Sequence, residues 1–333
     1  MIKNILIAFG IVTFPISAAY QSAAADNYSI IERYKGPDGG YDYISIDVAA
    51  QRVFVGREYG VLAIDLESKT VIPKLMEAND VAAVLIIPET ELMLSTIWGD
   101  NHAVLFNRKT GKVIAKIPTG KEPDGALYEK TSDLVFVMNG ASEDITIIDI
   151  KQKNVIKTIP VGGKPEAAVA DGKGRVYINI EDTAEIVVID VKSLSIQARF
   201  TMPGCIEPTG IAYDDISGLL ISSCHNGIAK LTQATNGADK GFVTIGQNAD
   251  GAIFDPVRRQ VYIPCMDGTL SIFSLDNKGQ AGNIRVVKTQ YGARTIGMDP
   301  VSGTLYLPAT DYETNDKGEE VRKAGTFNVL VVK

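Results

Sequence analysis

One block of sequence recurs seven times along the chain, and this repetition constrains the fold more than any other feature. Two clear copies begin at Val135 (VFVMNGASEDITIIDIKQKNVIKTIPVGGKP) and at Val176 (VYINIEDTAEIVVIDVKSLSIQARFTMPG). Each copy has an apolar run, a polar turn, a second run that ends near Asp, and a third run, which is the pattern of a small antiparallel sheet. One bulky residue of the second strand marks each copy: Phe54, Met93, Phe136, Tyr177, Leu220, Tyr262 and Tyr306.

The spacing of these markers and the two chain ends predict the architecture. The markers lie 39 to 44 residues apart, which is the period of four-stranded blades placed around an axis. The seventh copy stops at its third strand, TFNVLVVK, whereas the segment YSIIERYKG from Tyr28 matches the outer strand KVIAKIPTG from Lys112. An unpaired strand edge readily accepts such a strand. We therefore expect an all-β, seven-bladed propeller of four-stranded antiparallel blades, closed by the N-terminal strand that completes the last blade.

Several segments of the repeat point to a known group of propellers. They are the outer strand and turn KVIAKIPTGKEP ending at Pro123, the inner-strand start DGALYE from Asp124, FVMN from Phe136, and the strand ends at Asp149 and Asp190. In these segments the repeat resembles that of the YVTN-repeat, YncE-like family of bacterial β-propellers, over nearly the whole mature chain. The resemblance implies a fold more than a function, because one fold serves many activities. Blade 5 departs most, with GIAKLTQATNGADK in place of the usual third strand and turn.

The first 25 residues are typical of a secretory signal peptide. Lys3 precedes an apolar run from Ile5 to Ala19, and small residues end the segment at Ala25. There is no Cys at this cleavage site, and no other apolar stretch is long enough to span a bilayer. We expect residues 1–25 to be removed, and residues 26–333 to form a monomeric propeller in the periplasm or outside the cell.

Charge and motifs narrow the possible activities. The chain has 33 Lys and Arg against 40 Asp and Glu, a net charge of -7, which argues against general binding to nucleic-acid phosphates. It contains no Gly-rich phosphate loop and no Gly-x-Ser-x-Gly motif. The one nucleophile beside a base in sequence is Cys224 next to His225, and this adjacency does not itself place the two side chains together. An enzyme is therefore the less favoured class.

The antiparallel strand order brings two sets of loops to one end of the ring. We call this end the upper face; it carries the loops between second and third strands and the loops that lead into each inner strand. The residues that begin the inner strands, the head positions, are Asp42, Asp80, Asp124, Glu166, Thr209, Asp250 and Arg294. Five are acids, and a ring of carboxylates would raise its own pKa values or bind a divalent cation. Alternatively, each Asp accepts backbone amides in a tight turn.

The rare residues of the chain also map to the upper face. They are Trp98, His102, His225 and the three cysteines. Aromatic and titratable groups gathered in a concave place are typical of a binding site. Each also has a simpler interpretation, since Trp98 can pack between blades and an isolated surface His often has no role.

The cysteines allow one disulfide. Export permits disulfides, and three cysteines leave one unpaired. Cys205 precedes the inner strand of blade 5 and Cys224 ends the neighbouring strand at the same face, so we expect these two to pair and Cys265 to be the free thiol. The alternative is three unpaired, half-buried thiols.

Two hypotheses about function follow. The favoured one is a non-catalytic scaffold without a cofactor, which binds an unidentified protein or small molecule through the upper face. Its expected contacts are Asp42, Asp80, Asp124, Glu166, Asp250 and Arg294, with Trp98, His102 and His225 as outer contacts. The alternative is a metal-dependent propeller hydrolase or lyase of the lactonase type, in which a divalent cation at the channel mouth polarises a substrate carbonyl. The sequence assigns neither catalytic residues nor metal ligands.

Overall fold

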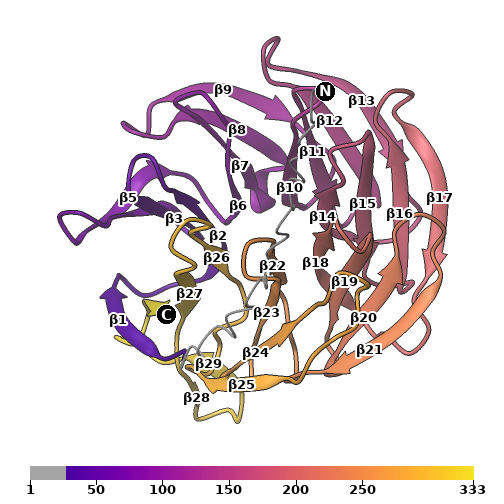
Figure 1. Ribbon diagram of the computed structural model, residues 1–333. Coiled ribbons are helices and arrows are strands. Elements are labelled where there is room, and N and C mark those ends of the chain that lie inside the picture. The colour runs from indigo at the N-terminus through magenta and orange to yellow at the C-terminus, as the bar shows by residue number, and fades with distance from the viewer. Residues whose placement is uncertain (1–27) are drawn as a thin grey trace, which may run out of the picture.

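A ring of antiparallel sheets forms the molecule. The computed structural model describes residues 28–333, in which seven four-stranded sheets surround a central axis (Figure 1). The predicted seven-bladed propeller is therefore confirmed, while the predicted signal peptide lies outside the described residues. Among residues 28–333, no helix has the length and apolar character needed to cross a membrane.

The first four blades are regular, with strands in sequence order from the axis outward. Blade 1 comprises β2 (Tyr41–Asp47), β3 (Arg52–Arg57), β4 (Gly60–Asp65) and β5 (Thr70–Glu77). Blade 2 comprises β6 (Val81–Ile86), β7 (Leu92–Ile97), β8 (His102–Asn107) and β9 (Val113–Pro118), with the 3-10 helix η1 (Trp98–Asp100) after β7. Blade 3 comprises β10 (Pro123–Glu129), β11 (Leu134–Asn139), β12 (Asp144–Asp149) and β13 (Asn154–Pro160). Blade 4 comprises β14 (Pro165–Ala170), β15 (Arg175–Ile180), β16 (Glu185–Asp190) and β17 (Ser195–Thr201).

The last three blades include the shortest inner strands. Blade 5 comprises β18 (Pro208–Asp214), β19 (Leu219–Cys224), β20 (Ile228–Gln233) and β21 (Asp239–Thr244). Blade 6 comprises β22 (Ile253–Asp255), β23 (Gln260–Cys265), β24 (Thr269–Ser274) and β25 (Arg285–Lys288). Blade 7 comprises β26 (Gly297–Met298), β27 (Leu305–Ala309), β30 (Asn328–Val332) and β1 (Ile30–Lys35), and the hairpin of β28 (Tyr312–Thr314) and β29 (Glu320–Arg322) lies between β27 and β30.

The N-terminal strand closes the ring as expected. β1 pairs antiparallel with β30, with Arg33 opposite Leu330 and Lys35 opposite Asn328. The indigo β1 and the yellow C-terminus lie together in Figure 1. This pairing satisfies the backbone edge that blade 7 would otherwise expose.

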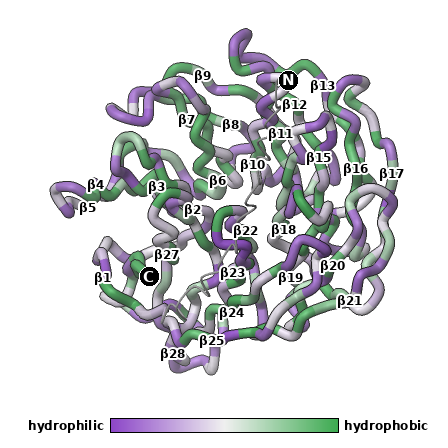
Figure 2. The backbone as a smooth tube through the Cα atoms, viewed as in Figure 1, coloured by the Kyte–Doolittle hydropathy of each residue, from purple (hydrophilic) through white to green (hydrophobic). Residues whose placement is uncertain are grey.

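Apolar side chains fill the spaces between neighbouring blades. Among the described residues, seven clusters of buried side chains lie between neighbouring blades. One of them, for example, joins Phe136 and Ile147 of blade 3 to Ile178 and Val187 of blade 4. Hydrophobic stretches follow the strands in Figure 2, and hydrophilic stretches are frequent in the turns. Because each blade buries both faces against its neighbours, the alternating strand pattern of the repeat is sufficient to stack the ring.

Two local features of the repeat can be followed in the strands and turns. The Asp residues at the ends of third strands do initiate turns, since Asp65 Oδ1 accepts the Ser68 backbone N–H at 2.9 Å and Asp149 Oδ1 accepts that of Gln152 at 2.9 Å. Blade 5, whose sequence departs most from the repeat, still forms a four-stranded sheet in sequence order. Its third strand β20 pairs along its length with β19, because the residues of GIAKLTQ still alternate between the two blade faces.

Candidate functional site

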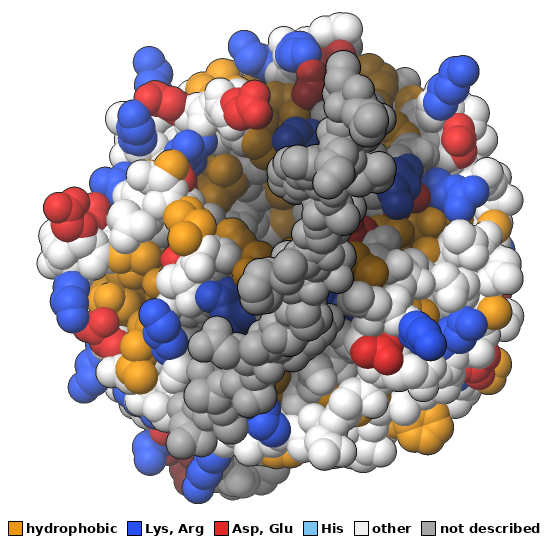
Figure 3. All heavy atoms as spheres, in the orientation of Figure 1, with side chains coloured by type: hydrophobic (Ala, Val, Ile, Leu, Met, Phe, Trp, Pro, Cys, Tyr) orange, Lys and Arg blue, Asp and Glu red, His pale blue; other side chains and the backbone are white. Residues whose placement is uncertain are grey.

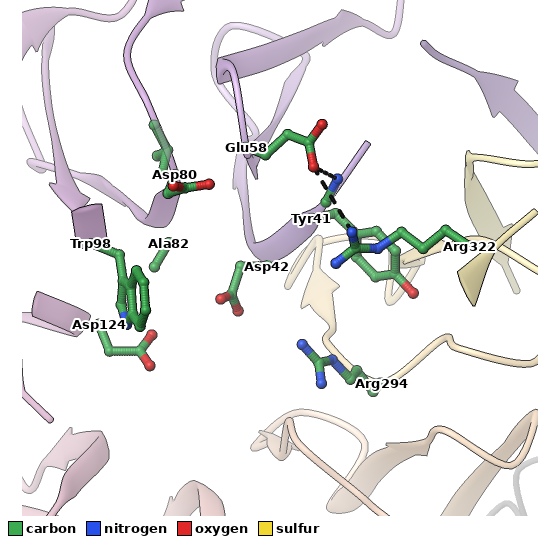
Figure 4. Close-up of a pocket in the computed structure, with 11 residues that line it drawn as sticks. Tyr41, Asp42, Glu58, Asp80, Ala82, Trp98, Asp124, Arg294 and Arg322 are labelled. Atoms are coloured by element: carbon green, nitrogen blue, oxygen red, sulfur yellow. Dashed lines mark hydrogen bonds and ion pairs between the residues drawn. The ribbon is translucent and has the colours of Figure 1, made fainter. Parts of the chain in front are cut away.

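A pocket of about 470 Å³ opens at the mouth of the central channel (Figure 4). The register places the head positions beside the loops between second and third strands, because Pro123 pairs with Asn139 and Asn139 pairs with Asp144. Both loop sets therefore share the upper face, as the sequence predicted. The pocket is lined by blades 1, 2, 3 and 7 through Gly40, Tyr41, Asp42, Glu58, Asp80, Val81, Ala82, Trp98, Asp124, Arg294 and Arg322.

Interblade hydrogen bonds hold two of the acidic head residues in place. Asp42 and Asp124 are the second residues of β2 and β10. The Thr295 hydroxyl donates to the Asp42 carbonyl oxygen at 2.9 Å, and the Thr96 hydroxyl donates to the Asp124 carbonyl oxygen at 2.6 Å. Each backbone is thus fixed by the adjacent blade, and the two carboxyl groups face the pocket (Figure 4).

The axial position of blade 2 differs from the sequence prediction. Asp80 has a φ of 51°, like Glu122 at 52° and Asn248 at 52° in the turns that precede the other inner strands. Val81 pairs with Ile97 as Pro123 pairs with Asn139, so the residue equivalent to Asp124 is Ala82. Asp80 is exposed at the rim of the pocket instead. The count back from Met93 led to Asp80, whereas the strand pairing makes Leu94 the equivalent of Phe136 and places the axial residue two positions after Asp80.

The acids around the axis are electrostatically strained. Burial, followed by the charges of Asp124 and Asp250, raises the pKa of Asp42 and that of Glu166 well above their usual values. Burial and the charge of Asp250 raise the pKa of Asp124 to about 6. Crowded carboxyl groups in a desolvated place resist simultaneous ionisation, and such perturbed groups cluster at functional sites.

Two basic residues compensate part of this charge. Arg294 Nε lies 3.2 Å from Asp250 Oδ2, and Asp250 is the main cause of the raised pKa of Arg294. Lys164 Nζ lies 3.8 Å from Glu166 Oε2 and makes a closer ion pair with Glu181. The acids on the blade 4 to blade 6 side of the axis therefore have direct cationic partners.

The acids on the pocket side lack such partners. Within residues 28–333, neither carboxyl oxygen of Asp42 or Asp124 accepts a hydrogen bond from the protein, and Asp124 Oδ1 is buried. On the blade 4 side, Glu166 Oε2 is also buried without a hydrogen-bond donor, in a residue that is 7% exposed, although Lys164 lies 3.8 Å from it. Unsatisfied buried oxygens of this kind are uncommon and call for a ligand, a water or a functional explanation.

Trp98 forms the wall of the pocket next to Asp124. It begins η1, and its backbone N–H donates to the Asp80 carbonyl oxygen at 2.9 Å. Its side chain is 44% exposed, and the indole lies beside the Asp124 carboxyl group in Figure 4. Trp98 therefore contributes an open aromatic face to the pocket rather than packing fully between blades.

The opposite wall contains residues that sequence reasoning did not select. Glu58 Oε2 accepts the Gly40 backbone N–H at 2.6 Å and lies 3.8 Å from Arg322 Nη1. Arg322 belongs to β29, so the blade 7 insertion reaches over to blade 1 (Figure 4). Glu58 directly follows β3, so its place in a loop of the upper face could be inferred from the repeat, whereas the approach of the β28–β29 hairpin to it could not.

The other residues predicted for the site lie away from this pocket. His102 begins β8, with its Nδ1 3.2 Å from the Asp100 carbonyl oxygen, and His225 Nδ1 lies 2.7 Å from Glu207 Oε2 in blade 5. Neither histidine lines the pocket. Cys205 and Cys224 form a disulfide, the pair named from the sequence, and Cys265 is the free buried cysteine.

Below the acids the channel changes character. A smaller cavity of about 200 Å³ is lined mainly by glycines, alanines and aliphatic side chains of the inner strands, with Tyr43 and Asp250 among them. Among the described residues, no three His, Cys, Asp or Glu side chains are grouped closely enough to hold a metal ion. On the face that Figure 3 presents, basic and acidic side chains are interspersed around the rim.

Comparisons with known proteins support the fold alone. No family model matches the chain, and no curated protein matches it. Among solved structures, the WD40 repeats of RRP9 superpose with a TM-score of 0.76 at 9% identity, covering 91% of this chain and 98% of that one. U3-55K superposes with a TM-score of 0.75 at 10% identity and the same coverages. Hydrazine synthase of Kuenenia stuttgartiensis superposes with a TM-score of 0.70 at 12% identity, covering 89% of this chain and 99% of that one. The chain is thus a seven-bladed β-propeller similar in architecture to these proteins.

Proposed function

We propose that this protein is an exported, non-catalytic binding propeller of the YncE-like kind, which captures a ligand or a protein partner at the mouth of its channel. The observation that carries the proposal is the pocket itself: an exposed aromatic ring, Trp98, beside the unpartnered carboxyl groups of Asp42 and Asp124. A pocket of this volume with a few convergent polar groups is typical of a ligand site. Propellers use the loops at one end of the ring for such binding.

The cost of the acid cluster supports the same proposal. Ionised carboxyl groups that are desolvated and close together reduce the stability of the folded state. Asp42, Asp124 and Glu166 all have raised pKa values, and two of their oxygens are buried without hydrogen-bond donors. A fold that needs only turns at these positions gains nothing from this arrangement, whereas a binding site gains an attractive group for a ligand.

Trp98 provides the test, because it is the single tryptophan of the chain and lines the pocket. A ligand screen by thermal shift is followed by titration with tryptophan fluorescence. A true ligand raises the melting temperature by mass action and changes the Trp98 emission. The double variant Asp42→Asn, Asp124→Asn is expected to bind this ligand more weakly. His225→Gln, on the same face but outside the pocket, is the matched control. Ligands that stabilise the protein without affecting Trp98 fluorescence, and that bind this double variant normally, would show that the binding site lies outside this pocket.

The metal-dependent hydrolase or lyase is distinguished in the same assay. It requires that Ca²⁺ or another divalent ion bind near the axis, raise the melting temperature at micromolar concentration, and lose this effect in the double variant. The scaffold proposal expects no such response.

Export is tested separately. Expression of the full chain in a Gram-negative host, followed by N-terminal analysis of the periplasmic fraction, is expected to find the protein beginning at Asp26. Retention of Met1 in the cytoplasmic fraction would contradict export.

A further inference from the structure

The charges of the pocket are unequally partnered. Of its two basic side chains, Arg294 is paired with Asp250, and Arg322 lies against Glu58. The acids Asp80 and Asp124 have no ion pair and no side-chain hydrogen bond within the described residues. Unused negative charge therefore lies on the blade 2 and blade 3 side of the pocket, and the positive charge on the blade 7 side is already engaged.

The aromatic ring lies on this same anionic side. Trp98 follows β7, beside Asp124 in Figure 4, and its backbone is hydrogen-bonded to the turn that carries Asp80. The negative face of an indole attracts cations more strongly than any other side-chain ring. A cation in this part of the pocket is thus attracted by three groups: the open indole of Trp98 and the unpartnered carboxylates of Asp80 and Asp124.

The unpartnered oxygens also specify the kind of cation. The Asp124 carboxylate faces the pocket and accepts no hydrogen bond within the described residues, so a bound group that donates N–H satisfies it, whereas one without N–H leaves it unsatisfied. A guanidinium group is planar, stacks on an aromatic ring and donates two parallel hydrogen bonds to a carboxylate. The pocket of about 470 Å³ has room for such a group and the chain that carries it.

Resting on the proposed binding function, we infer that the pocket binds an organic cation with N–H donors, an alkylguanidinium or primary ammonium group, held between Trp98 and the carboxylates of Asp80 and Asp124. The group belongs either to a free small molecule or to a Lys or Arg side chain of a protein partner. The chemistry of recognition is the same for both sources.

The primary experiment is a titration of Trp98 fluorescence with four probes: agmatine, choline, glutarate and CaCl₂. Agmatine carries a guanidinium and a primary ammonium group, choline carries positive charge without N–H, and glutarate is an anion. We expect a saturable change with agmatine and none with the other three at equal concentration. Choline binding as tightly as agmatine would overturn the requirement for N–H donors.

Two variants locate the interaction. Asp124→Asn is expected to weaken agmatine binding about tenfold or more, because it removes a charge-assisted hydrogen bond. Asp80→Asn, at an exposed rim position whose positive φ suits Asn, is expected to weaken it severalfold without any risk to folding. Asp215→Asn, an exposed acid after β18 outside this pocket, is the control and is expected to have no effect.

A peptide pair separates the two sources. Acetyl-Gly-Arg-Gly-amide is compared with its citrulline counterpart, which keeps the shape but loses the charge. Tighter binding of the Arg peptide than of agmatine assigns the cation to a protein partner, and the reverse order assigns it to a small molecule. No saturable response to agmatine or to the Arg peptide, or equal affinity in both pocket variants and the wild type, would overturn the inference. A response to glutarate or Ca²⁺ instead would retain the pocket as a binding site while showing that its ligand class is wrong.

Discussion

Replacing Asp124 by Asn should stabilise the folded protein at neutral pH. The folded-state pKa of Asp124 is about 6, compared with 3.8 for the isolated side chain, because of burial and the charge of Asp250. A displacement of this size corresponds to about 3 kcal/mol at a pH above both values. The Asp124 side chain is partly exposed and solvent screening reduces the cost, so we expect a gain of about 2 kcal/mol for the isosteric, uncharged Asn.

The sign of the pH dependence follows from the direction of the shift. The native state holds this proton more strongly than the unfolded chain, so the contribution of Asp124 to stability is greatest below pH 4 and is lost as the pH rises through about 6. The advantage of the Asn variant should therefore fall to about half at pH 5 and to about a fifth at pH 4. The charged groups that act electrostatically on the Asp124 carboxyl group are Asp42, Glu166, Glu181, Asp250, Lys164 and Arg294.

Thermal unfolding followed by circular dichroism measures this effect. At about pH 7.5, the variant should melt a few degrees above the wild type, and Asp215→Asn should melt with the wild type. An unchanged or lower melting temperature for Asp124→Asn would refute the argument that its ionised carboxyl group destabilises the ring. A gain of the same size at pH 4 and at pH 7.5 would also refute it, because such a gain would not arise from ionisation.

Three further predictions concern the scaffold. Deleting residues 26–36 removes β1 and exposes the edge of β30, so the melting temperature should fall sharply and the protein should aggregate; removal of residues 1–25 alone is the control, and equal melting curves would refute ring closure by β1. In native, unreduced protein, a thiol reagent should leave Cys205 and Cys224 unmodified and should label Cys265 only after unfolding, because burial raises its pKa to about 11; peptide mapping that finds labelled Cys205 would contradict the bridge. Arg259→Leu leaves the fully buried Asp214 without its bidentate partner and should cost about 3–5 kcal/mol in urea unfolding; a loss below about 1 kcal/mol would show that the pair contributes no more than a surface ion pair.

Part of the candidate site was accessible from the sequence because it depends on strand order. Successive strands of a blade run in opposite directions, and this determines which loops share a face of the ring. The grouping of Asp42, Asp124 and Trp98 on the upper face could therefore be inferred without coordinates. The approach of Arg322 and the pairing of Arg294 with Asp250 could not. They depend on where a long hairpin folds and on which side-chain rotamers meet between neighbouring blades 6 and 7.

By itself, the sequence determined the number of blades, the closure by β1 and the choice of Cys205 and Cys224 as partners, because these follow from repeat period, an unsatisfied strand edge and neighbouring strand ends. Only the tertiary structure decided which acids surround the axis. Asp80 falls on the rim, in the turn before β6, and Ala82, two residues later, takes the axial place, because the register in which β6 pairs with β7, rather than a count along the repeat, decides which residue reaches the axis. Burial and the charges of other blades then set the pKa values of the acids, and these are properties of the closed ring that no single repeat contains.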